Sequence, residues 1–119
     1  MFKILCVTDR GSCRGSLEAQ LSGIFAAGPD GIILRDKQAD AADYAALLTR
    51  VQAAGVRSGV PVIAHSFAAA ANRAGVTALH LPLPLLTAMP DAEKAAFSQI
   101  GASCHSVSDA ETAYRCGAS

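Results

Sequence analysis

Tryptophan is absent from this 119-residue sequence, and aromatic side chains make up only 5% of it. Leucine, isoleucine, valine and alanine supply the apolar surface instead, which is typical of strands that helices cover on both sides. Neither sign of charge is in excess, since ten Lys and Arg balance ten Asp and Glu, whereas binding to nucleic acid requires a basic face. No apolar run approaches the ~20 residues of a membrane-spanning helix. We therefore expect a domain that binds neither nucleic acid nor membrane.

The cysteines are not arranged as a cofactor site requires. None forms a C-x-x-C pair and their spacing matches no zinc pattern, the four being Cys6, Cys13, Cys104 and Cys116. Residues 1–7 are apolar but too short for a signal peptide, so we expect a cytoplasmic protein with reduced thiols. Cys104 precedes His105, but neighbours in a strand point to opposite faces, which argues against a thiolate–imidazole pair. We expect no cofactor.

Short apolar runs alternate with helical patterns along the whole chain. Strands are predicted over residues 2–7, 31–34, 60–64, 78–81 and 98–103. Helices are predicted over residues 16–27, 40–54, 66–74, 91–97 and 108–116. Gly55 is expected to stop the second helix, and a capping box, Ser108-x-x-Glu111, to start the last one. The pattern gives five βα units in one domain, residues 1–119, as the length also favours.

Strands that alternate with helices imply a parallel sheet with right-handed crossovers. Two α/β architectures fit five such units. One is a doubly wound sheet of the flavodoxin type. The other is a TIM-type barrel cut short to a half-barrel, since complete barrels usually need ~250 residues. In both, the carboxyl ends of the strands lie on one face, where a ligand would bind.

Two strand ends carry side chains suited to an anion. Arg35 and Lys37 follow a buried strand, and Arg grips two phosphate oxygens while Lys acts as a point charge. Ser103 and His105 end the last strand, and residues two apart share a face, so a hydroxyl and an acid/base group would lie together. The structural alternatives are a solvated loop, with Asp36 as the partner of Arg35, and a group of helix-capping residues after the last strand.

The other two histidines lie in different settings. His65 ends the third strand just before an alanine-rich helix, whose N-terminus would attract an anion, although a simple capping role is the alternative. His80 lies between apolar residues in the sequence Ala-Leu-His-Leu-Pro, and we interpret it as a core histidine with its hydrogen bonds satisfied.

Taken together and in order, five segments resemble the thiamine phosphate synthase/TenI superfamily over nearly the whole chain. They are VTDR (7–10), LRDK (34–37), PVI (61–63), ALHLP (78–82) and IGASCHS (100–106). The resemblance implies a TIM-type barrel and a phosphorylated small molecule as the ligand. It places Arg35 and Lys37 where the synthase holds pyrophosphate, and Ser103 where a hydroxyl contacts the same group. It places His105 where the tautomerase has its acid/base histidine.

Departures from the family pattern decide between its branches. The synthase has Asn-Asp where this chain has His65-Ser66, and an Asp where this chain has Leu83-Pro84-Leu85-Leu86. Those acids hold Mg²⁺, a cation that prefers carboxylates, so we expect no metal and a thiazole tautomerase of the TenI type. The alternatives are a fragment of the transferase and a non-catalytic, regulatory phosphate-binding remnant.

The family pattern continues with further βα units beyond the fifth. The resemblance therefore predicts a truncated (βα)5 half-barrel whose activity the truncation could abolish. Open strand edges and an exposed apolar face favour association, so we expect a homo-oligomer that covers them.

Overall fold

The computed structural model describes residues 3–12 and 15–118. The strands are β1 (Leu5–Val7), β2 (Gly31–Leu34), β3 (Val62–His65), β4 (Ala78–Pro82) and β5 (Gln99–Ser103). The α-helices are α1 (Leu17–Ala27), α2 (Ala41–Ser58), α3 (Ala68–Ala74), α4 (Leu83–Ala88), α5 (Asp91–Lys94) and α6 (Val107–Arg115), and a 3-10 turn, η1, spans Arg10–Ser12. Strands and helices alternate as the sequence predicts.

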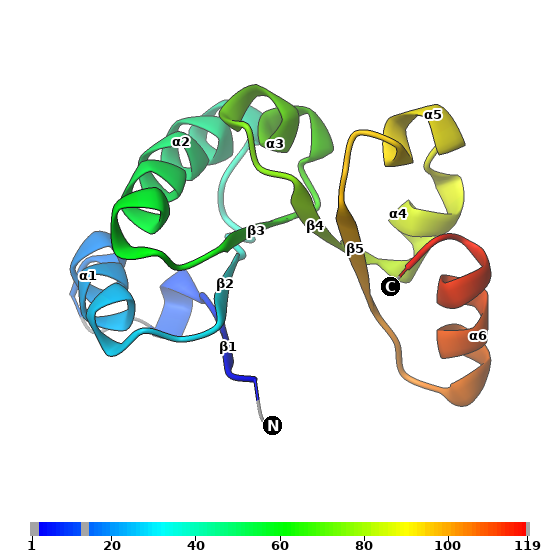
Figure 1. Cartoon of the computed structure of the whole chain (residues 1–119), viewed down its shortest axis with the longest axis horizontal. Coiled ribbons are helices and arrows are strands. Elements are labelled where there is room, and N and C mark those ends of the chain that lie inside the picture. The colour runs from blue at the N-terminus through cyan, green and yellow to red at the C-terminus, as the bar shows by residue number, and fades with distance from the viewer. Residues whose placement is uncertain (1–2, 13–14, 119) are drawn as a thin grey trace.

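The five strands form one sheet in the order β1-β2-β3-β4-β5, and every neighbouring pair is parallel. In Figure 1 the strands curve into an arc, the helices lie outside it, and β1 and β5 stand at its two ends. Strands that lie in the same order as in the chain form a segment of a barrel. In a flavodoxin-type sheet the second strand lies on the other side of the first, so the strand order differs from the chain order. The half-barrel prediction is confirmed, and the doubly wound alternative is wrong.

Side chains alternate between the two faces of this arc, as the strand period of two requires. One set, including Ile32, Leu34 and Leu79, is almost completely buried and forms the core with the helices. The other set lines the concave inner face, where Leu5 and Val7 remain 50% and 56% exposed. The inner face is thus the open side of the sheet, and its side chains are available to a ligand.

Several elements differ from the predicted ranges, and three of the differences have local physical reasons. Helix α2 continues through Gly55 to Ser58 and ends at Gly59, whose φ of 70° is left-handed. Helix α4 is absent from the predicted elements, because its short Leu-Pro-Leu-Leu start follows β4 directly, with no loop between them. The capping box at Ser108 is wrong, because the Ser106 hydroxyl accepts from Asp109 N–H and starts α6 earlier.

Other features follow the sequence more closely. Cys6 is partly buried against the core, whereas Cys104 is exposed and Cys13 lies outside the described residues. Among the helices of the described residues, none combines the length and the apolar character needed to cross a membrane.

Gly55 provides a close helix–strand approach rather than a helix end. A Cβ placed there would lie 2.7 Å from the carbonyl oxygen of Val60 and 2.7 Å from Cγ2 of Val62. Gly55→Ala should therefore lower the free energy of unfolding by about 1–3 kcal/mol through overpacking.

Gly23 in α1 is the matched control, because nothing lies within 4 Å of a Cβ there. Gly23→Ala should raise stability by up to ~1 kcal/mol, the ordinary helix-propensity gain. Urea unfolding followed by circular dichroism measures both variants. Equal effects at the two positions would contradict the close packing of α2 on β3.

Candidate functional site

Four polar side chains gather on the inner face at the carboxyl ends of the strands. Leu34 pairs with Ala64 in the β2–β3 register, so the next residues, Arg35 and His65, stand side by side. His65 pairs in turn with His80 of β4. Ser103 of β5 pairs with Pro82, one layer above His80. We call Arg35, His65, His80 and Ser103 the polar row.

His80 and Ser103 form a hydrogen-bonded pair, with His80 Nε2 and Ser103 Oγ 2.9 Å apart. Gly101 leaves the space that the imidazole fills, since a Cβ at that position would lie 2.7 Å from His80 Nδ1. A larger residue at position 101 would therefore displace the ring from Ser103.

His65 is held by the residue that follows it. The Ser66 hydroxyl lies 3.0 Å from His65 Nδ1, and Ser66 N–H donates to the His80 carbonyl at 3.1 Å. Ser66 adopts a φ of 72°, the one left-handed non-glycine residue in the described ranges. Such a backbone costs of the order of 1–3 kcal/mol and is found where a site requires it. The rings of His65 and His80 stack with centroids 5.8 Å apart.

The surroundings of both imidazoles favour the neutral form. Burial lowers the pKa of His65, and the neighbouring His80 and Arg35 charges lower it further. Burial alone lowers the pKa of His80. Each ring is therefore harder to protonate than a histidine in water.

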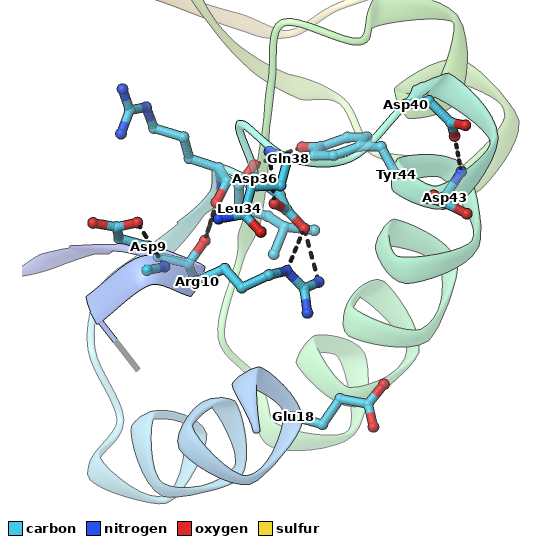
Figure 2. A network of polar contacts seen from close by, with 12 residues as sticks. Asp9, Arg10, Glu18, Leu34, Asp36, Gln38, Asp40, Asp43 and Tyr44 are labelled. Carbon is cyan, nitrogen blue, oxygen red and sulfur yellow. Dashed lines mark hydrogen bonds and ion pairs between the residues drawn. The ribbon is translucent and has the colours of Figure 1, made fainter. Parts of the chain in front are cut away.

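Arg35 is not neutralised by the adjacent Asp36. That carboxylate is only 6% exposed and binds Arg10 instead, with Nε at 2.9 Å and Nη2 at 2.7 Å (Figure 2). The hydrogen bond from Arg10 lowers the pKa of Asp36 despite its burial. Within residues 3–12 and 15–118, no hydrogen bond or ion pair is formed by the Arg35 guanidinium. The expected pairing of Asp36 with Arg35 is wrong, because Asp36 binds Arg10.

The backbone of Arg35 is fixed from the β1 side. The Thr8 hydroxyl donates to the Arg35 carbonyl and accepts from the Arg35 N–H, both at 2.8 Å. Thr8 is itself buried. The paired strands β1 and β2 are thus still joined at Arg35, beyond the last residue pair of their ladder, by hydrogen bonds to the Thr8 hydroxyl.

Tyr44 of α2 fixes the other side of the same strand end. Its hydroxyl donates to the Leu34 carbonyl at 2.6 Å and accepts from the His65 N–H at 2.9 Å. The ring is fully buried and stacks on Phe67 at 4.5 Å. Burial raises the pKa of Tyr44 from 10.0 to about 12. The stabilisation that this phenol provides is therefore complete below pH 10 and is lost as the pH rises through 12.

The remaining predicted residues lie outside the polar row. Lys37 is exposed in the turn after β2. His105 is exposed after β5, and its backbone N–H donates to Asp109 Oδ2 at 3.1 Å. Neither side chain contacts the row in the described part of the chain. Their roles as ligand and acid/base group stay predictions.

Sequence reasoning did not assign His80 to the site. Its hydrogen bond is satisfied, as expected of a core histidine, but the ring is half-buried on the inner face. The alternation of side chains along the strand could have indicated its position. Leu79 and Leu81 face the helices, so His80 between them must face the inner side.

The donor set of this face does not suit magnesium. Ser66 and Leu83 stand where the resemblance expects carboxylates, and no group of three or more Asp, Glu, His or Cys able to hold a metal occurs among the described residues. Magnesium prefers carboxylate oxygens in proteins, and the polar row carries none. We derive no step through a metal.

Below the polar row the inner face is apolar. A depression of about 300 Å³ is lined mainly by Leu5, Ile33, Ile63, His80 and Gly101. An apolar floor beside convergent polar groups is typical of small-molecule sites.

Comparison with known proteins gives the family. A family model described as thiamine monophosphate synthase matches residues 4–119. This chain belongs to that family. No curated protein sequence matches it.

A solved structure shares the family fold. Thiamine phosphate pyrophosphorylase from Pyrococcus furiosus superposes with a TM-score of 0.78 at 17% identity, over 98% of the present chain. The chain spans 56% of that protein's length. The likeness shows the fold of this family member, with its strands in barrel order.

Replacing Tyr44 with phenylalanine should lower the free energy of unfolding by about 1–3 kcal/mol, because the Leu34 carbonyl and the His65 N–H would lose their buried partner. Tyr114, which is 78% exposed, is the matched control, and Tyr114→Phe should stay within about 0.5 kcal/mol of wild type. Chemical denaturation measures both. Equal stability of the two variants would contradict the bridging role of Tyr44.

Proposed function

We propose that this thiamine monophosphate synthase family domain binds a phosphorylated small molecule, of the thiazole phosphate or pyrophosphate type, at the polar row. The observation that carries the proposal is a guanidinium without an anionic partner in the described residues, set beside two imidazoles and a hydroxyl. Charge-assisted hydrogen bonds from such groups suit phosphate oxygens. The apolar depression below the row would hold an aromatic ring.

The reaction we propose is isomerisation of a thiazole carboxylate phosphate, with His105 as the acid/base group. Tautomerisation takes one proton from the substrate and returns one to it, so a single group can serve as both base and acid. Histidine suits this exchange near neutral pH. Arg35, His65 and Ser103 would hold the phosphate, and Lys37 would add a second cation from the turn.

Transfer with release of pyrophosphate is the second candidate. The names of the matching family and of the Pyrococcus furiosus protein favour it. The residues of the inner face favour isomerisation instead. The polar row carries imidazoles and a hydroxyl and lacks the carboxylates that a magnesium-dependent transfer would use.

The test is turnover of thiazole carboxylate phosphate by the purified chain. We expect His105→Ala to lower kcat by about 10²–10⁴-fold, the usual share of acid–base catalysis. Cys104→Ala, at the exposed neighbouring position, is the control and should keep wild-type turnover. If His105→Ala matches an active wild type, His105 is structural. If wild type binds pyrophosphate without turnover, the domain is a non-catalytic binding module.

We also propose that two copies associate through the inner face near β1. Leu5 and Val7 are about half exposed there. Val7→Asp should shift the species seen by light scattering toward monomer. Val56→Asp, at a 73% exposed position of α2, should not. A monomeric wild type at all concentrations would contradict the proposal.

A further inference from the structure

The donors that the polar row can offer to an anion depend on where its hydrogen atoms lie. Ser103 has one hydroxyl hydrogen, and a neutral imidazole has one donor and one acceptor nitrogen. When Nε2 of His80 accepts from Ser103, that hydrogen is used within the protein. When Nε2 carries a hydrogen, as it always does in the protonated ring, it donates to Ser103 Oγ across the same 2.9 Å and frees the serine hydrogen for a ligand.

His65 can offer a hydrogen at Nε2 in both forms, but a positive charge only when it is protonated. Its Nδ1 lies 3.0 Å from the Ser66 hydroxyl, and Nε2 has no hydrogen-bond partner among the described residues. In the neutral ring Nδ1 can accept from Ser66 while Nε2 carries the hydrogen. Protonation makes both nitrogens donors and adds a charge beside the place where an anion would bind.

The surroundings of the two rings oppose protonation unless an anion is bound. Burial, the His80 ring and Arg35 of the β2 end oppose protonation of His65, and burial opposes protonation of His80. Tyr44 of α2 reaches the row through its neutral hydroxyl, while α4, the helix after β4, has no titratable residue.

The carboxylates nearest in the chain are already engaged. Asp36 is buried against Arg10, and Asp109 of α6 accepts from the His105 backbone. Exposed charged or titratable groups at the strand ends and on the neighbouring helices include Asp9 after β1, whose Oδ1 accepts from the Gly11 N–H, Lys37 after β2, Arg73 of α3, and Cys104 and His105 after β5.

We infer that the polar row takes up a proton together with its anion: a phosphate or pyrophosphate group binds as His65 and His80 become imidazolium. This inference rests on the proposed function and adds His80 to the binding residues. The proton comes from solvent, and no bond other than the N–H bond forms. The neutral rings of the free protein would thus become cationic only when the ligand compensates their charge.

The consequence is an affinity that rises as the pH falls. The free histidines have lowered pKa values, and a bound anion raises them, so each linked proton strengthens binding by up to about tenfold per pH unit between the two values. Sulfate is the appropriate probe, because its charge is constant over the range of about pH 5–8 in which histidine titrates.

Calorimetric titration of sulfate into the full chain, in two buffers of different ionisation enthalpy, gives the affinity and the number of protons taken up. Wild type should take up protons and bind more tightly at lower pH. The double variant His65→Gln/His80→Gln should lose both effects. His105→Gln removes the third histidine and should retain both.

A second measurement needs no variant. In the ¹⁵N-histidine spectra of wild type, saturating sulfate should raise the pKa of two of the three histidines. Binding without proton uptake or pKa change would overturn the inference and leave anion binding intact. Absence of sulfate and pyrophosphate binding would overturn both. Linkage that disappears only in His105→Gln would assign the proton to His105 and overturn the role of the pair.

Discussion

The Tyr44 hydroxyl holds two strand ends together at the point where the backbone ladder stops. It links the last carbonyl of β2 to the N–H of His65, and its aromatic ring is sealed in the core by Phe67. Thr8 makes the corresponding link from the β1 side to Arg35. These bonds fix Arg35 and His65 side by side. A ligand site on parallel strands needs such links, because the ends of the strands have no further neighbours to pair with.

The other half of the polar row, His80 and Ser103, depends on a missing side chain rather than on a bridging hydroxyl. Gly101 leaves room for the His80 ring, which then reaches Ser103 on the neighbouring strand. Ser66 adopts a left-handed backbone conformation, and its hydroxyl contacts the His65 ring. Polar groups and local strain are thus concentrated on the inner face, while the apolar helix-facing core stabilises the sheet that carries them. This separation lets the inner face serve binding.

The sequence predicts the alternation of elements and the family, because these depend on local patterns and ordered motifs. What it does not predict depends on distant contacts. The Arg10 partner of Asp36 comes from a separate turn, 26 residues away. Gly55 resembles a helix stop until the approach of β3 is known. His80 resembles a core residue because its neighbours are buried, and the sheet shows that it faces the opposite side.

The account depends on the polar row being where an anionic ligand binds. A crystal structure of the chain grown with pyrophosphate tests this most directly. We predict a bound pyrophosphate with oxygens in hydrogen-bond contact with the Arg35 guanidinium, His65 Nε2 and Ser103 Oγ, and with the strand ends unmoved. A pyrophosphate bound at another face, with the row left to solvent, would contradict the account.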